Sequence, residues 1–203
     1  MSISEQDRER ISAAIRAAET RTSGEIVCVL AESSSDAIGL PILLATLAAL
    51  AVPWVLMAAT ALPVRSILVL QVITFIVLAL VLCLPQIRVA LLPRRARRTL
   101  AHRVAVEQFS IRGIARKKDR NGILIFVSLA EHYARIIADV GIAAKVPHAH
   151  WQGAVDTLVA ECGHGRIADG FISAIDVCGG VLATHFPRTP ESRDELPDRI
   201  YVI

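Results

Sequence analysis

The sequence predicts an α/β fold in which a small mixed sheet, covered by helices, is interrupted by a two-helix transmembrane hairpin. Long uncharged stretches fill residues 40–87, and short apolar runs typical of buried strands lie on both sides of them, among segments with helical spacing. With 203 residues, 54% of them hydrophobic, the chain is more apolar than an ordinary soluble domain. We therefore expect four regions: residues 1–39 and 88–186 form two parts of one soluble domain, residues 40–87 form the hairpin, and residues 187–203 form a flexible tail.

The first region contains a helix and a strand. Ser4 is a suitable N-cap for a helix ending near Arg21, because apolar residues follow it at helical spacing (Ile11, Ala14, Ile15 and Ala18). Ser23 and Gly24 end this helix. Residues 25–31 are short and rich in β-branched side chains, which favours a strand buried on both faces. One strand is not stable alone, so its partners must lie beyond residue 87.

The second region is predicted to cross a bilayer twice. Residues 40–62 and 66–87 contain no charged side chain, and each stretch exceeds the roughly 20 residues that a helix needs to span the hydrocarbon. Only residues 63–65 connect them, so the two helices should be antiparallel and in contact. We expect a multi-pass protein of the bacterial inner membrane, with the lipid bilayer as its first partner.

Basic residues predict the orientation. Arg94, Arg95, Arg97 and Arg98 follow the second stretch, whereas Arg65 is alone in the turn. Positive residues favour the cytoplasmic side, so both termini should lie in the cytoplasm. The cluster has two compatible interpretations, a contact with anionic lipid headgroups and a topological stop signal. Without interleaved aromatic residues, it does not indicate a nucleic-acid partner.

The third region supplies the rest of the soluble domain. Residues 94–111 have the pattern of a basic helix, and residues 123–129 and 133–138 are apolar runs separated by a short polar turn, which predicts a β-hairpin. Residues 151–162 and 167–182 carry apolar side chains at helical spacing and should cover a sheet. The charged, proline-rich segment 187–197 lacks such a pattern and predicts a loose tail.

Several features in this order resemble one family. They are Thr22–Val29 after the first helix, Gly122 before the strand pair, Arg135–Ile142, and Asp169-Gly170 in the last helix. Their order is similar to that of the TPM domain family over residues 1–35 and 95–186. The best-studied members carry an anchor at one end, whereas a hairpin interrupts the domain here. The chain therefore resembles the small bacterial integral-membrane branch of the family.

The resemblance implies a search for metal ligands, since some members of the family act as acid phosphatases or bind divalent metal. Glu25 begins the first strand and Asp139 follows the third, so both could meet at one edge of the sheet and, with Asp119 or Asp169, hold Ca²⁺ or Mg²⁺. The alternative is that Glu25 and Asp139 accept hydrogen bonds from loop amides while Asp169 interacts with a helix dipole. No other cofactor is indicated.

Other reactive residue types do not form a recognisable site. His148 and His150 lie just before a helix without a third ligand at metal-binding spacing, and His132 and His164 fall in turns. The four cysteines match no zinc motif, which favours reduced, buried thiols. No nucleophile elbow is present.

These observations favour a membrane-tethered, non-enzymatic interaction or quality-control module whose partner is another membrane protein. A metal-assisted acid phosphatase using Glu25 and Asp139 is one alternative. An oligomeric pore or transporter subunit is another, although the two spans lack the charged residues that usually mark a pathway. A homo-oligomer is compatible with each of them.

Overall fold

The computed structural model describes residues 3–34, 38–116, 119–189 and 196–203. The chain forms two compact units, unit 1 (Met1–Ser34 with Arg98–Ile203) and unit 2 (Ser35–Arg97). The α-helices are α1 (Glu5–Glu19), α2 (Gly39–Ala59), α3 (Val64–Leu82), α4 (Pro85–Leu91), α5 (Arg94–Ile111), α6 (Val140–Ala143), α7 (Gln152–Gly163) and α8 (Ile167–His185). The strands are β1 (Glu25–Ala31), β2 (Gly122–Ser128), β3 (Tyr133–Ala138) and β4 (Ile200–Val202), and two short 3₁₀ helices are η1 (Ile114–Arg116) and η2 (His148–Trp151).

Unit 1 is built on a mixed sheet with the strand order β3-β2-β1-β4. β1 and β2 are parallel, with Glu25 opposite Gly122, and β2 and β3 form the predicted antiparallel hairpin. Every residue of β1 and β2 is buried, as expected for central strands that are covered on both faces. The α/β class predicted from the sequence, a small mixed sheet covered by helices, is confirmed.

The strand β4 was not predicted. Residues 200–202 run parallel to β1, where Cys28 lies opposite Ile200 and Leu30 opposite Val202. The expectation of a flexible tail over 187–203 is therefore wrong for these three residues. Their β-branched and aromatic side chains suit a strand, and β1 offers them an unpaired edge. The guanidinium groups of Arg112 and Arg199 lie 3.8 and 4.8 Å from the ring centroid of Tyr201.

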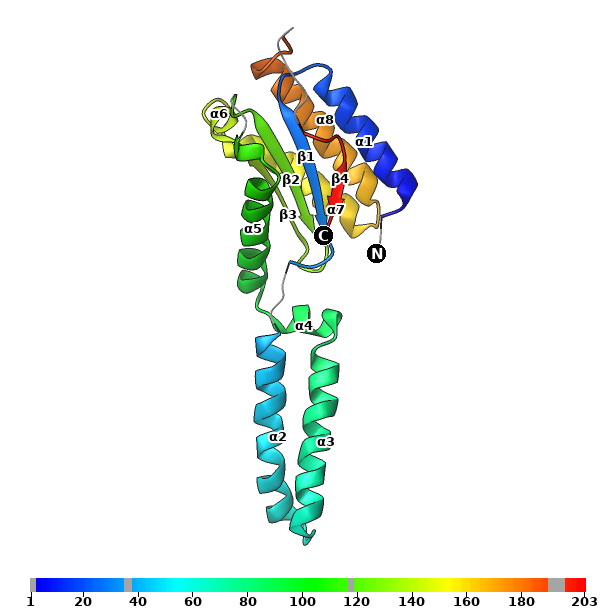
Figure 1. Cartoon of the computed structure of the whole chain (residues 1–203), viewed down its shortest axis with the longest axis vertical. Coiled ribbons are helices and arrows are strands. Elements are labelled where there is room, and N and C mark those ends of the chain that lie inside the picture. Colours follow the sequence, from blue (N-terminus) through cyan, green and yellow to red (C-terminus); the bar gives the residue numbers. More distant parts are fainter. Residues whose placement is uncertain (1–2, 35–37, 117–118, 190–195) are drawn as a thin grey trace. The chain divides into compact units, whose positions relative to one another are not determined.

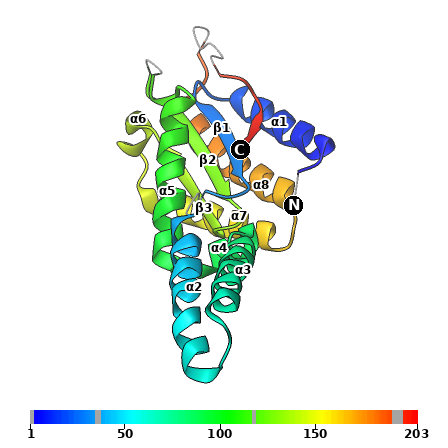
Figure 2. The ribbon, with the colours of Figure 1, turned by 60° about the horizontal axis from the view of Figure 1, so that its bottom comes forward.

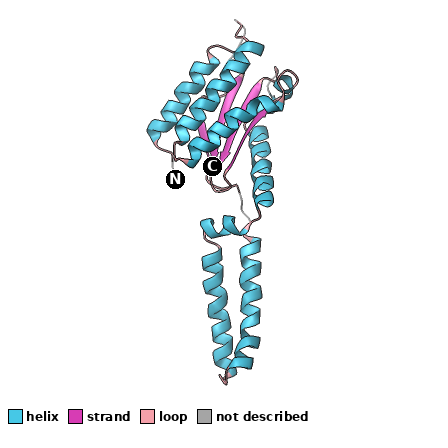
Figure 3. Cartoon of the chain, turned by 180° about the vertical axis from the view of Figure 1, so that it is seen from behind, coloured by secondary structure: helices cyan, strands magenta, loops and turns pink. Residues whose placement is uncertain are grey.

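Helices cover both faces of the sheet. α1, α7 and α8 lie on one face, and α5 lies on the other (Figures 1 and 3). The larger core, on the α8 side, includes Ile11 and Ile15 of α1 and Phe171 of α8, all fully buried. Ser4 caps α1 as predicted, because its hydroxyl accepts a hydrogen bond from the Asp7 N–H at 3.1 Å.

The smaller core joins α5 and η1 to the sheet. Ala105 of α5 and Ile114 of η1 are fully buried against Leu124 and Phe126 of β2. Figure 2 shows α5 beside β2 and β3. The small side chain of Ala105 lets the helix backbone approach the sheet closely, which explains how one basic helix can cover this face.

Unit 2 consists of α2, α3 and α4, and α2 and α3 lie side by side (Figures 1 and 2). Ala45 and Ala49 of α2 and Ile67 of α3 are buried, and most other side chains of the two helices are exposed. Three helices of the described chain are long and apolar enough to cross a membrane: α2, α3 and α8. In α8, half of the most apolar 18-residue stretch is buried, whereas the corresponding share is 11% in α2 and 6% in α3. α8 is therefore a core helix of unit 1.

Candidate functional site

The two predicted acidic residues lie at the same edge of the sheet. Glu25 is the first residue of β1 and pairs with Gly122, and the N–H of Asp139 donates to the carbonyl of Gly122 at 3.0 Å. Glu25 and Asp139 are both buried, with 3% and 4% of their surface exposed. Asn121 precedes Gly122 and is also buried, and its amide donates to the carbonyl of Ser23 at 2.9 Å. This end of the strands thus brings together buried side-chain oxygens from three segments of the chain.

Asp139 already has partners within the protein. It caps the short helix α6, since its Oδ1 accepts a hydrogen bond from the Val140 N–H at 2.7 Å. The guanidinium of Arg120 lies 3.7 Å from the same oxygen. Its second oxygen, Oδ2, is buried and has no hydrogen-bond partner among the described residues. A buried carboxylate oxygen of this kind is costly unless something binds it.

A bulky side chain separates the two carboxylates. Glu25 and Asp139 flank Gly122 from the strands on either side, so their backbones are about two strand spacings, or roughly 10 Å, apart. Ile114 packs directly over Gly122, because a Cβ placed on this glycine would lie 2.4 Å from the Ile114 Cγ2. Oxygen ligands of this type suit Ca²⁺ or Mg²⁺, but their spacing does not favour one shared ion. The metal role of Glu25 and Asp139 stays a prediction.

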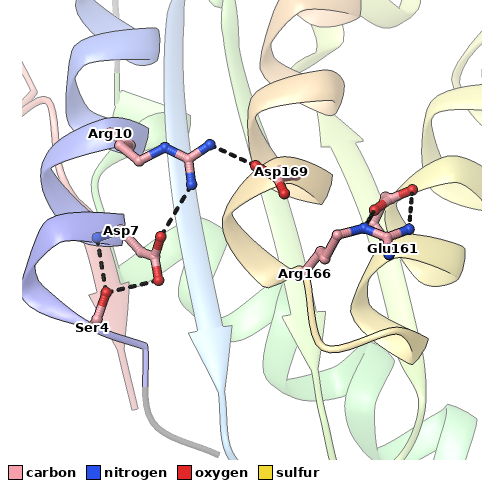
Figure 4. A network of polar contacts seen from close by, with 6 residues as sticks. All are labelled: Ser4, Asp7, Arg10, Glu161, Arg166 and Asp169. Carbon is pink, nitrogen blue, oxygen red and sulfur yellow. Dashed lines mark hydrogen bonds and ion pairs between the residues drawn. The ribbon is translucent and has the colours of Figure 1, made fainter.

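The other two acids do not join this pair in one metal-binding group. Asp169 is in the first turn of α8 and accepts from Arg10 of α1 at 2.6 Å, in the network of Figure 4. The opposite end of α8 lies near Glu25, because the carbonyl of Phe186 accepts from the Ser23 N–H. At 1.5 Å per residue, Asp169 is about 25 Å from that end, so it cannot share an ion with Glu25.

Asp119 is exposed, and the described residues contain no group of three or more His, Cys, Asp or Glu side chains arranged to hold a metal. Figure 4 also shows Arg166 paired with Glu161 at the end of α7. This hydrogen bond lowers the pKa of Glu161, just as the bond to Asp169 raises the pKa of Arg10. Both pairs connect helices and have the geometry of structural contacts.

The histidines occupy the positions that the sequence suggested. His150 is exposed in η2, with its ring edge-on to Trp151, and His132 is in the turn between β2 and β3 with a positive φ of 49°. The Nδ1 of His164 lies 2.7 Å from the Ala160 carbonyl at the end of α7. The side chain of His148 lies outside the described residues. None of the described histidines belongs to a group of three or more His, Cys, Asp or Glu side chains that could hold a metal.

None of the four cysteines forms a disulfide, and Cys28 and Cys178 are buried. Burial raises the pKa of both thiols well above the ordinary value and raises that of Cys162 to about 11. All three therefore remain protonated near neutral pH and are poor nucleophiles.

A polar network at the opposite end of the strands, after the last residues of β1 and β2, was not predicted from the sequence. Glu131, in the turn after β2, is buried and accepts hydrogen bonds from the hydroxyls of Ser128 and Ser33 and from the Ser34 N–H. The Ser34 hydroxyl also donates to that of Ser128 at 2.7 Å. The network fixes the chain just after β1 to the turn between β2 and β3. A buried acid after a buried strand was the available signal, but its partners Ser33 and Ser34 are about 100 positions away in the sequence.

The basic cluster lies in the first turns of α5. Arg94, Arg95 and Arg98 are exposed, while Arg97 is half-buried and donates from Nε to the Leu92 carbonyl at 2.9 Å. Positive side chains at a helix N-terminus oppose the helix dipole, and the first turn of α5 contains no acidic residue. This arrangement does not stabilise the helix, so an anion outside it, such as a lipid headgroup, remains the predicted partner of the cluster.

Comparisons with known proteins agree with the fold. The model of a family described as TPM domain matches residues 84–181, which contain α5, β2, β3, α7 and most of α8. The NMR structure of the BA42 protein from the psychrophilic bacterium Bizionia argentinensis resembles the chain with a TM-score of 0.62 and 20% sequence identity, over 100% of this chain and 96% of that one. At this identity the likeness shows the fold alone. The comparison with curated proteins gave no match. Residues 84–181, just under half of the chain, therefore match the TPM domain family, and the mixed sheet with its helices agrees with that match.

Proposed function

We propose that this chain is a membrane-tethered TPM domain that binds another membrane protein, as a non-enzymatic interaction or quality-control module. The observation that carries the tether is the exposure of α2 and α3. Their large side chains, such as Leu47, Trp54, Leu68 and Leu80, have between 53% and 75% of their surface exposed. A soluble protein rarely exposes so large an apolar surface, whereas hydrocarbon chains would cover it without cost.

The topology follows from charge. The connection between α2 and α3, with Arg65 in the first turn of α3, lies on the far side of the membrane, and both termini, with unit 1, lie in the cytoplasm of a bacterial cell. Arg94, Arg95, Arg97 and Arg98 then lie at the cytoplasmic surface, where anionic headgroups balance charges that oppose the dipole of α5.

Reporter fusions in bacterial cells test this topology. A C-terminal fluorescent protein should fluoresce and a C-terminal alkaline phosphatase should be inactive, whereas phosphatase inserted at Arg65 should be active. Release of the full chain from membranes by alkaline carbonate would refute the tether. Active phosphatase at the C-terminus would reverse the orientation.

The interaction role is supported by the lack of a group of three or more metal-ligating side chains among the described residues and by the covalent connection of unit 1 to the apolar helices of unit 2. Photo-crosslinking in intact membranes, followed by mass spectrometry, should capture the same membrane protein repeatedly. A matched chain with unit 1 inactivated by Phe171→Asp, which places a charge in the core, should lose that product. Repeated crosslinking without any specific product counts against the role.

A metal-assisted phosphatase is the second candidate. It is favoured by the buried Asp139 Oδ2 and Asn121 Oδ1, neither of which has a hydrogen-bond partner among the described residues. Calorimetric titration with Ca²⁺ and Mg²⁺ and hydrolysis of p-nitrophenyl phosphate test it. If the chain is a phosphatase of this kind, Asp139→Asn should abolish both ion binding and hydrolysis of p-nitrophenyl phosphate. Hydrolysis that survives this substitution would exclude the phosphatase function.

A further inference from the structure

The strand β3 has an outer edge without a partner strand in the part of the chain that the structure describes. In an antiparallel pair, residues alternate between those whose backbone groups face the neighbouring strand and those whose groups face away. The hydrogen bond from the Asp139 N–H to the Gly122 carbonyl sets this alternation. The N–H and C=O groups of Ala134, Ile136 and Ala138 therefore point away from β2, toward the position of a further strand.

A groove lies along this edge. It has a volume of about 460 Å³ and is formed by the first half of β3, the turn before it, α7 and the start of α5 in unit 1. Ile136 and Trp151 are buried in its wall, and Val155 and Val159 of α7 add apolar surface, with Val159 40% exposed. An extended chain beside β3 would therefore meet both unpaired backbone groups and an apolar wall.

The charges of the groove are mainly positive. Arg98 and Arg135 line it, with His132 beside them, and Asp156 is its one acid. Neither arginine has an ion-pair partner among the described residues. The field of Arg135 also reaches α5, where burial and this charge together lower the pKa of His102. The groove is thus complementary to a negatively charged ligand.

The positive side and the apolar side of the groove lie on opposite faces of the sheet. Arg135 lies opposite Phe126, which belongs to the core under α5, whereas Ile136 lies opposite Ile125, which belongs to the core under α8. A strand added to β3 would expose alternate side chains to these faces. Acidic residues suit the face of Arg98 and Arg135, and apolar residues suit the face of α7. A second copy of this chain is disfavoured, because pairing two β3 edges would bring like charges together.

We propose that an extended segment of a partner protein, with acidic and apolar residues in alternation, binds the outer edge of β3 as a fifth strand. Main-chain hydrogen bonds to Ala134, Ile136 and Ala138 provide the pairing, and the arginines select the charge. This inference rests on the proposed interaction role and names the surface and the kind of partner.

A labelled synthetic peptide of alternating Glu and Val tests the site by fluorescence anisotropy, with the full chain in mild detergent. The peptide should bind, more weakly as salt rises. Arg135→Glu and, separately, Arg98→Glu should each weaken binding by roughly tenfold. In the double variant, a peptide of alternating Lys and Val should bind in place of the acidic one. In a Trp54→Phe background, fluorescence of the buried Trp151 shows whether each variant is folded.

A control peptide separates strand pairing from simple charge attraction. Methylation of alternate backbone nitrogens keeps every charge but removes the hydrogen bonds, so this peptide should bind at least tenfold more weakly. Equal binding of the two peptides, or unchanged binding in both arginine variants, would overturn the proposal. This experiment can fail independently of the crosslinking experiment. If crosslinking captures a partner but the peptide does not bind, the interaction role stands and the partner binds a surface other than the edge of β3.

Discussion

Two adjacent glycines of α8 provide a matched test of how closely α1 packs against this helix. Gly180 is exposed, and a Cβ built on it meets nothing within 4 Å, whereas a Cβ on Gly179 would lie 2.8 Å from the Cβ of Ala18 in α1. Both glycines lie in the interior of the helix, so replacement by alanine brings the same intrinsic gain. The difference between the two variants therefore reports the contact between α1 and α8.

The expected magnitudes follow from this geometry. Gly180→Ala should raise the free energy of unfolding by about 1 kcal/mol, the usual helix-propensity difference. In Gly179→Ala the same gain is opposed by an overpacking cost of about 1–3 kcal/mol, because both Cβ atoms are fixed to helix backbones. The variant should therefore be unchanged or less stable by up to about 2 kcal/mol, and the two variants should differ by about 1–3 kcal/mol.

Urea denaturation of the full chain in mild detergent measures these free energies. The chain contains two tryptophans, and Trp151 is 2% exposed in unit 1, so a Trp54→Phe background makes fluorescence report on unit 1 alone. Adding Ala18→Gly removes the opposing atom and should suppress the cost of Gly179→Ala while leaving the effect of Gly180→Ala intact. Equal stabilisation by Gly179→Ala and Gly180→Ala would show that the two helices are not in close contact.

Three further predictions concern unit 1. Burial and the charge of Arg135 lower the pKa of His102 below its ordinary 6.5, so the unfolded chain binds this proton more tightly than the folded chain does. The free energy of unfolding should therefore rise with pH up to about 6.5. The variant His102→Gln should flatten this rise in urea titrations at several pH values. Tyr201→Ala removes two stacked guanidinium contacts and should cost at least about 1–2 kcal/mol in the same assay, whereas Tyr201→Phe should retain most of the stability. Gly122→Ala should lower the melting temperature, because the new Cβ would meet Ile114 at an overpacking cost of about 1–3 kcal/mol. This cost should shrink when Ile114→Ala is also present. Additive effects of the two substitutions would contradict the contact between Gly122 and Ile114.

Local patterns predicted most elements of unit 1, because each is encoded in a short window. Ser4 and the apolar spacing after it specify α1, the apolar run in residues 25–31 specifies β1, and the polar turn between β2 and β3 specifies their hairpin. β4 was missed because three residues after a proline-rich, charged segment carry no comparable pattern. Only the neighbouring edge of β1 makes a strand of them.

The candidate site was predictable in part. That Glu25 and Asp139 lie at one edge follows from their positions at strand ends, and the structure places both there. Their separation by Ile114 depends on η1 packing over Gly122, which no spacing in the sequence expresses. Asp169 pairs instead with Arg10, a partner 159 positions away.

The sequence by itself determined the α/β class, the two long apolar helices α2 and α3 and the basic start of α5, because composition and periodicity are properties of neighbouring residues. The tertiary structure alone decided which strand edges are paired, which acids lie together and that β3 presents its backbone to a groove with a positive charge. Those properties depend on side chains brought together by the packing of unit 1, and the energy of such contacts depends on distances in space that are not encoded in local order.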